Sequence, residues 1–163
     1  MILSILKSLS LGVWLGSLLM LGAAVAAPIF QQLPSKTMAG NLNAVILSRM
    51  NMLEWVCGAL AFITSLILLA ANWSGEFRTL RIIETCLIFL TVTILWFYSS
   101  NMTSRMTELR ATIQDFDTPR ETTEYVQAKK EFDELHKRYT MFVGINMVLI
   151  TSAFVLSVVN TRG

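Results

Sequence analysis

The single histidine of the chain, His136, is the side chain best suited to hold a cofactor. It follows closely on three carboxylates, Glu131, Asp133 and Glu134. An imidazole in such a setting can ligate a metal, a haem or a chlorophyll, or titrate near neutral pH. A metal site is not expected, because one histidine without a second ligand at helical spacing leaves a coordination shell incomplete. The sequence requires no cofactor, and we favour the interpretation of His136 as an interfacial polar residue.

Two acidic residues, Glu54 and Glu84, lie near the ends of apolar segments. A carboxylate inside a membrane is a functional candidate, because burial of its charge is costly. Structural ion pairs are the competing interpretation: Arg81 precedes Glu84 by one helical turn, and Arg49 or the cations of a later charged segment could reach Glu54. We favour ion pairs, because no string of polar residues crosses any apolar segment, which argues against a pump or channel.

No constellation for catalysis stands out in the sequence. It has no hydrolase triad, P-loop or dinucleotide fingerprint. Cys57 and Cys86 lie in apolar stretches without a CxxC spacing, as packing residues do. The net charge of +2 comes without a basic patch, which argues against nucleic-acid binding. We therefore expect a protein that is not an enzyme.

Four apolar segments, at about 5–27, 53–71, 82–98 and 139–159, must position these side chains. A bilayer core about 30 Å thick is crossed by about 20 helical residues. Lipid offers no partner to backbone groups, so each segment is expected to be a helix. Apolar residues make up 54% of the chain and charged residues 15%, a balance typical of membrane proteins. The expected fold is all-α: one domain over 1–163, built as a four-helix transmembrane bundle.

The connections between these segments carry their own signals. The first segment resembles a cleavable secretory signal, but Pro28 lies close to the would-be scissile bond, so we interpret it as an uncleaved first span. Ser35 is suited to cap a helix that runs straight into the second span. The connection 72–80 is short, so spans two and three should form an antiparallel pair.

The charged segment 99–138 is predicted to be an antiparallel helical hairpin that extends helices three and four beyond the membrane. Apolar residues recur every three or four positions on both arms: Met102, Met106, Leu109, Ile113 and Phe116, then Tyr125, Ala128, Phe132 and Leu135. One register matches Met102 with Leu135, Met106 with Phe132, Leu109 with Ala128 and Ile113 with Tyr125. Between the arms, Thr118, Pro119 and Glu121 fit a capping box that begins the second arm. An arm of about 17 residues would project about 25 Å; a disordered charged loop is the alternative.

Small residues mark one side of the first span. Ser8, Gly12 and Gly16 are followed by Gly22 and Ala26, with small residues four positions apart in each group. Such residues let helices approach closely where lipid provides no hydrophobic drive. The face is either a docking site for a partner subunit or a packing face inside the bundle, and the sequence leaves both open.

The chain resembles the bacterial relatives of transmembrane protein 205. The resemblance rests on Trp14-Leu15-Gly16, on 26–30 (Ala-Ala-Pro-Ile-Phe), and on Phe132 and His136 followed by Asn146. It implies a small four-span protein whose domain has no assigned function. That family is loosely similar to copper-resistance membrane proteins, but this sequence lacks clusters of His and Met, since its nine methionines are scattered.

Together these features predict a non-catalytic, multi-pass membrane protein that serves as an accessory or scaffolding subunit of a respiratory or photosynthetic complex. It would dock on other membrane subunits through the first span, and on a peripheral partner through the hairpin 99–138. A small transport or metal-tolerance protein is the alternative, and it predicts a polar cavity near Glu54, Glu84, Asn146 and His136. The location expected is a bacterial inner membrane. The first span follows Lys7, which favours both chain ends inside and the hairpin outside. The raw count of Lys and Arg, nine on the hairpin side against four on the other, favours the reverse orientation.

Overall fold

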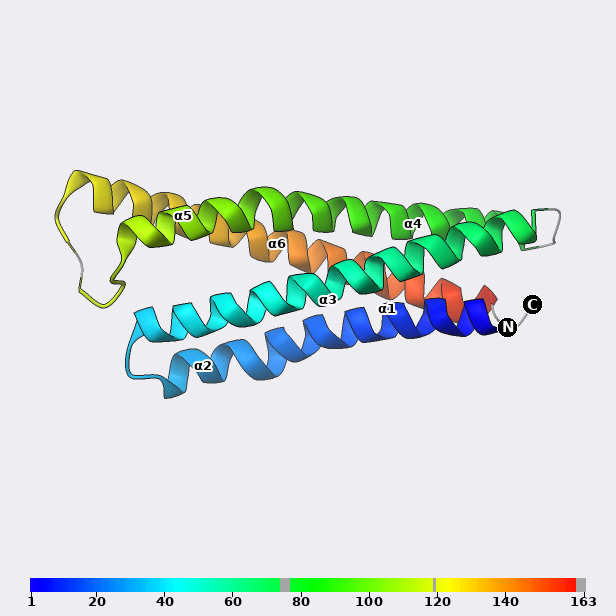
Figure 1. Cartoon of the computed structure of the whole chain (residues 1–163), viewed down its shortest axis with the longest axis horizontal. Helices are drawn as coiled ribbons and strands as arrows, with labels where there is room; N and C mark the ends of the chain where they lie inside the picture. Colours follow the sequence, from blue (N-terminus) through cyan, green and yellow to red (C-terminus); the bar gives the residue numbers. More distant parts are fainter. Residues whose placement is uncertain (74–76, 119, 161–163) are drawn as a thin grey trace.

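Four long helical runs lie side by side in the computed structural model, which describes residues 1–73, 77–118 and 120–160 (Figure 1). The first run comprises α1 (Ile2–Met20), a π-helical turn η1 (Leu21–Val25) and α2 (Ala26–Gln32). The second is α3 (Lys36–Ala71). The third comprises α4 (Arg78–Phe97), a second π-helical turn η2 (Tyr98–Met102) and α5 (Thr103–Ile113), and the fourth is α6 (Thr123–Asn160). The described part of the chain contains no strand, so the all-α prediction is confirmed.

All four runs are long and apolar enough to cross a membrane, consistent with a multi-pass integral membrane protein. They hold between 31 and 38 residues. At 1.5 Å per residue a run of 36 residues is about 54 Å long, well beyond the roughly 30 Å of a bilayer core. The sequence predicted such an extension for the third and fourth helices, and a helix from Ser35 that continues into the second span. In the structure, the first turns of α3 and the end of the first run accompany the α5–α6 end of the molecule (Figure 1).

The predicted cap of the second helix is confirmed. Ser35 has extended backbone, and its side-chain oxygen accepts a hydrogen bond from the amide of Met38 at 3.2 Å. This bond satisfies one of the amides that a helix start leaves without an internal partner. From there α3 runs without interruption into the second apolar segment.

The core lies where the buried faces of the four runs meet. Its apolar members include Leu11, Trp14, Ala61, Ile88, Leu95, Ile150 and Ala153. Small residues allow this approach: a Cβ added at Gly58 of α3 would lie 3.2 Å from the Trp14 ring and 3.3 Å from Val92. The bundle is therefore packed closely around the Trp14 indole.

The two arms of the 99–138 segment pack on each other as α5 and the first half of α6. Leu109, Ile113, Tyr125 and Ala128 form one buried cluster, joined by Phe116, Phe132 and Leu135. Met102 and Met106 are buried in the main core, against which Phe132 and Leu135 also pack. The apolar residues of the two arms therefore share buried clusters, and the residue-by-residue pairing stays a prediction. That this hairpin stands beyond a bilayer remains a prediction.

The predicted cap between the arms differs from the structure. Helix α5 ends at Ile113, because Gln114 adopts a positive φ of 56°, and α6 begins at Thr123. Thr118 and Glu121 therefore lie in the loop, and Pro119 lies outside the described residues. Phe116 also lies in the loop rather than on a helix, although its ring still contacts Phe132 at 5.3 Å.

A tertiary contact explains why the loop does not continue as helix. Asp117 accepts a hydrogen bond from the Ser35 hydroxyl and others from the backbone amides of Lys36 and Thr37. Asp115 accepts a hydrogen bond from the Thr37 hydroxyl at 3.2 Å. The loop thus supplies carboxylates to the amino end of α3, where free amides and the helix dipole favour negative charge. We call these contacts between Asp115, Asp117 and residues 35–37 the α3 clasp.

Candidate functional site

A buried polar cluster lies inside the bundle where η2 begins. Glu54 of α3 is 2% exposed, and Tyr98 and Asn146 are fully buried. The Tyr98 hydroxyl donates a short hydrogen bond to Glu54, and Asn146 Nδ2 lies 3.5 Å from the Tyr98 oxygen. Asn51 is also buried, and it precedes Glu54 by one turn on the same side of α3. We call Trp14, Asn51, Glu54, Tyr98 and Asn146 the Glu54 cluster. Each of the four helical runs contributes to it.

The π-helical turn places Tyr98 on the shared face. Buried residues of the third run recur at Thr91, Leu95, Tyr98, Met102 and Met106, which is four, three, four and then four positions. In a regular α-helix, two successive steps of four residues would place the last buried side chain about 80° around the helix from the first one. The extra residue of η2 absorbs this rotation, so α4 and α5 both keep their buried faces toward α6.

Several polar atoms of the Glu54 cluster make no hydrogen bond within the described chain. They are Asn146 Oδ1, Asn51 Oδ1 and Trp14 Nε1. The Trp14 indole interacts with the Glu54 carboxyl, but its N–H lacks the geometry of a hydrogen bond. The Tyr139 ring closes one side, edge-on to Tyr98 with ring centres 5.4 Å apart. Unpartnered buried polar atoms are rare in native structures, so their gathering around one carboxyl is informative.

A second polar cluster, of Lys7, Glu84 and Asn160, lies at the other end of the bundle. Lys7 and Glu84 form an ion pair, with side chains 2% and 1% exposed, and Asn160 Nδ2 donates to Glu84 at 2.7 Å. We call it the Lys7 cluster. Two hydroxyl pairs accompany it: Ser65 with Thr85 at 2.7 Å and Ser8 with Ser157 at 2.8 Å.

An apolar middle separates the two polar clusters. Glu84 and Tyr98 are fourteen residues apart on the third run, and Asn146 and Asn160 are fourteen apart on α6. Both spacings correspond to about 21 Å along a helix. Between them, the core is formed by residues such as Ile88, Leu95, Ile150 and Ala153.

The partners predicted for the two buried carboxylates were wrong. Glu84 pairs with Lys7 rather than Arg81, and Glu54 bonds to Tyr98 rather than to Arg49. The sequence did hold one usable signal: Lys7 falls on the same stripe as Leu11, Trp14 and Leu18, spaced four, three and four, and therefore faces the core. Which carboxylate it meets there depends on how the helices assemble.

The small residues of the first run do not share one face. Ser8 bonds to Ser157 of α6, and a Cβ at Gly12 would lie 3.5 Å from Phe154. These two belong to packing inside the bundle. Gly16 and Gly22 are exposed, with nothing within 4 Å of an added Cβ, and Ala26 is half-buried. Ser8 and Gly12 therefore agree with packing inside the bundle, whereas Gly16 and Gly22 leave room for a docking partner.

His136 lies on the exposed side of α6, outside both polar clusters, with its ring stacked on Phe132 at 6.2 Å. The described residues hold no group of three His, Cys, Asp or Glu side chains that could bind a metal. A transport site was expected to unite Glu54, Glu84, Asn146 and His136. The structure joins only Glu54 and Asn146, places Glu84 in the Lys7 cluster and leaves His136 apart.

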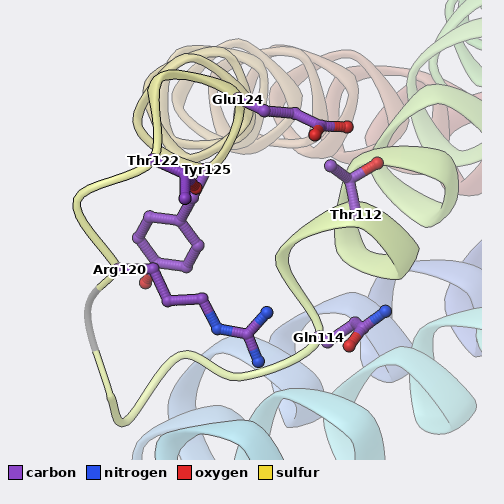
Figure 2. Close-up of a pocket in the computed structure, with 6 residues that line it drawn as sticks. All are labelled: Thr112, Gln114, Arg120, Thr122, Glu124 and Tyr125. Atoms are coloured by element: carbon purple, nitrogen blue, oxygen red, sulfur yellow. The ribbon is translucent and has the colours of Figure 1, made fainter.

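A polar pocket of about 360 Å³ lies between the arms of the hairpin (Figure 2). It is lined by Thr112, Gln114, Arg120, Thr122, Glu124 and Tyr125. Figure 2 shows the Arg120 side chain extending into the space between Tyr125 and Gln114. The Tyr125 hydroxyl donates to the carbonyl of Asp115 at 3.4 Å. The pocket is shallow and largely exposed, so it holds none of the buried groups that mark the clusters in the bundle.

Electrostatics outside the spans centre on the α3 clasp. Hydrogen bonds from Ser35 and from the amides of Lys36 and Thr37 lower the pKa of Asp117 to about 2. The backbone amide of Asp117 and the side chain of Thr118 lower the pKa of Asp115. Beside them Arg110 donates to the carbonyl of Gly40 in α3. The hairpin is therefore tied to α3 by charge-assisted hydrogen bonds.

Comparison with known proteins gives a family without a function. No curated protein and no solved structure matches the chain. A family model described as a domain of unknown function (DUF4149) matches residues 9–112, which include the first three helical runs almost entirely. These runs supply Trp14, Asn51, Glu54 and Tyr98, so the match covers four of the five residues of the Glu54 cluster, and Glu84 of the Lys7 cluster. The match extends over more than half of the chain, and the chain therefore belongs to this family of unknown function (DUF4149).

Proposed function

We propose that this membrane protein is a non-catalytic accessory or scaffolding subunit of a larger respiratory or photosynthetic membrane complex, and that it docks through its first helical run. The observation that supports this proposal most is that the other described helices leave the second half of this run uncovered. None of residues 19–32 is buried. Of the apolar window of the first run 11% is buried, against 39% in α3.

Small residues occupy this uncovered stretch. Gly16, Gly22, Ala23, Ala24 and Ala27 are exposed, and we call them the small-residue stretch. A missing side chain brings no advantage toward lipid, whereas it lets a second helix approach closely. No other described residue of the bundle fills the space beside Gly16 and Gly22. A helix of another subunit is the occupant that suits it.

The hairpin offers the second contact of the proposal. Its outer surface carries charged residues of both signs, among them Arg105, Glu108, Glu131 and Asp133, which pair along and between the arms. Because the α3 clasp holds the hairpin to the bundle, it presents a fixed surface rather than a loose loop. A peripheral partner with mixed charge would suit this surface.

Substitutions in the small-residue stretch test the docking proposal. Gly16→Leu with Gly22→Leu should abolish co-purification with the subunits of one membrane complex in mild detergent, while thermal stability stays unchanged. Gly144→Leu is the matched control, since a Cβ at Gly144 also meets nothing within 4 Å but lies on α6. Isolation of the unmodified protein as a lone, monodisperse species would contradict the proposal. Haem or pigment absorbance that is lost in His136→Ala would identify His136 as an axial ligand.

A second candidate function, in transport or metal tolerance, is favoured by the two polar clusters. Buried polar and charged side chains within membrane-spanning helices commonly mark a path for ions or substrate. Glu84→Ala and His136→Ala test it through metal binding and tolerance. Unchanged binding and tolerance in both variants would rule this function out.

A further inference from the structure

Glu54 is a buried acid without a compensating charge. The described chain gives it no Lys, Arg or His partner, and its hydrogen bond comes from the neutral Tyr98 hydroxyl. An ionised carboxylate with neutral neighbours is strongly disfavoured where water is excluded. The Lys7 cluster shows the contrast, because there Lys7 supplies a positive charge to Glu84. At Glu54 none of the described residues supplies such a charge.

The surroundings of Glu54 fit a proton better than a metal cation. Two amide oxygens, of Asn51 and Asn146, are buried without partners and can accept O–H groups. Trp14 Nε1 and Asn146 Nδ2 are N–H donors at the same place. Donors repel a metal ion but tolerate a neutral carboxylic acid or a water molecule, which both donates and accepts.

We propose that the Glu54 cluster is a reversible proton-binding site within the bundle. A hydronium ion transfers its proton to the Glu54 carboxylate, which leaves a neutral carboxylic acid and one water molecule. Tyr98 donates to the acid in either state. The amide oxygens of Asn51 and Asn146, with the Trp14 N–H, hold the water by which the proton arrives and leaves.

The other titratable groups around Glu54 do not replace it as the proton acceptor. Cys57 follows it by one turn on α3, Tyr98 faces it from η2, and Tyr139 lies behind Tyr98 on α6. Thiols and phenols are weaker acids than a carboxyl, so they stay neutral while Glu54 titrates. From α1 the facing residue is Trp14. Lys7 lies two turns before Trp14 on the same helix and is paired with Glu84 in the Lys7 cluster.

Infrared difference spectroscopy of the full chain in phosphatidylcholine vesicles tests this site. At neutral pH the protein should show the C=O stretch of a protonated, buried carboxylic acid, and this band should disappear as the pH is raised. Glu54→Gln should remove the band and Tyr98→Phe should shift it, because a hydrogen bond to the acid is lost. Glu134→Gln, an exposed acid of the hairpin, is the matched control and should leave the band unchanged.

Three results would overturn the assignment. The first is a spectrum of Glu54→Gln identical to that of the unmodified protein. The second is a band that responds to sodium at constant pH rather than to pH, which would make the site a sodium site. If Glu54→Gln does not fold, Tyr98→Phe decides, and an unshifted band in that variant is the third. Proton binding does not depend on docking: Gly16→Leu with Gly22→Leu should keep the band, so either proposal can fail alone.

Discussion

Two buried carboxylates in one small bundle are stabilised in different ways. Glu84 is held by Lys7 and Asn160, so its negative charge has a partner of opposite sign and a further donor. Glu54 is held by Tyr98 alone among the hydrogen bonds of the described chain. A compensated ion pair is expected to be static and structural, whereas an uncompensated acid gains or loses a proton. The two residues should therefore respond differently to substitution.

Removal of Lys7 should be costly. Lys7→Met leaves Glu84 as an unpaired charge within the bundle, and breaking a buried pair from one side costs about 3–5 kcal/mol. Thermal unfolding in detergent should show this loss. Adding Glu84→Gln to Lys7→Met should restore much of the stability, because the buried charge is then gone. Lys130→Met, at an exposed position, is the control, and equal stability of Lys7→Met and Lys130→Met would contradict a buried ion pair.

Acid should open the α3 clasp. The pKa of Asp117 is lowered to about 2 in the folded chain, against an ordinary value of 3.8. A lowered pKa means that the ionised form is favoured by folding. The clasp is therefore complete above about pH 4 and is lost as the pH falls toward 2. The protection of the Lys36 and Thr37 amides from hydrogen exchange, measured relative to an unstructured amide at the same pH, should fall over this interval. Asp117→Asn should show low protection at every pH, and protection that does not change with pH in the unmodified chain would contradict the clasp.

At the scale of the element, the π-helical turns explain how long helices keep their faces aligned. The third run serves two packing tasks: α4 packs in the bundle and α5 packs in the hairpin. In a regular α-helix, one extra residue between α4 and α5 would turn the buried face of α5 away from α6. The wider π-helical turn of η2 accommodates this residue, so both buried faces stay aligned. The same turn begins at Tyr98, the residue that bonds to Glu54. The helix irregularity and the polar cluster therefore share one position.

A deletion inside η2 should be tolerated better than one elsewhere in the same run. Removing the exposed Ser100 leaves a regular α-helix with its stripe still aligned, so the melting temperature should change little. Removing the exposed Thr93 from α4 rotates all that follows by about 100°, which takes Tyr98 away from Glu54 and should unfold the bundle. Thermal unfolding of the two deletion variants makes the comparison. Equal damage from both would show that η2 does not absorb an extra residue.

At the scale of the whole molecule, an even number of spans gives the two ends a fixed relation. The start of α1 and the end of α6 lie together at the Lys7 cluster, and the hairpin lies at the opposite end (Figure 1). If the chain crosses a bilayer four times, the two chain ends face one compartment and the hairpin faces the other. We propose that the chain ends face inside, as the position of Lys7 favours.

The orientation is checked by cysteine labelling. In a background with Cys57→Ser and Cys86→Ser, an impermeant maleimide added to spheroplasts should label Thr122→Cys of the hairpin loop. It should label Thr79→Cys, at the other end of the bundle, only after the membrane is opened. Both positions are exposed, so reactivity reports the compartment. The reverse pattern would place the hairpin inside, as the raw excess of Lys and Arg on that side suggests.

The membrane spans, the Ser35 cap and the apolar stripe of the hairpin were predicted from sequence because each is a local property. Hydropathy, capping chemistry and helical period are set by residues within a few turns of one another. The capping box predicted at Thr118 was also a local property, but in the structure a long-range contact replaces it. Asp117 instead bonds to Ser35, 82 positions away in sequence, where it satisfies the start of another helix.

The sequence by itself determined a four-helix membrane protein, because lipid leaves a long apolar segment no structure but a helix. Only the tertiary structure decided which polar side chains meet. The bond from Tyr98 to Glu54 spans 44 positions and that from Asn160 to Glu84 spans 76. Helical period tells which residues face inward, but helix order, tilt and depth decide what they face. The proposed proton site depends on the lack of a charge opposite Glu54 among the described residues, and that lack is for the same reason a property of the fold.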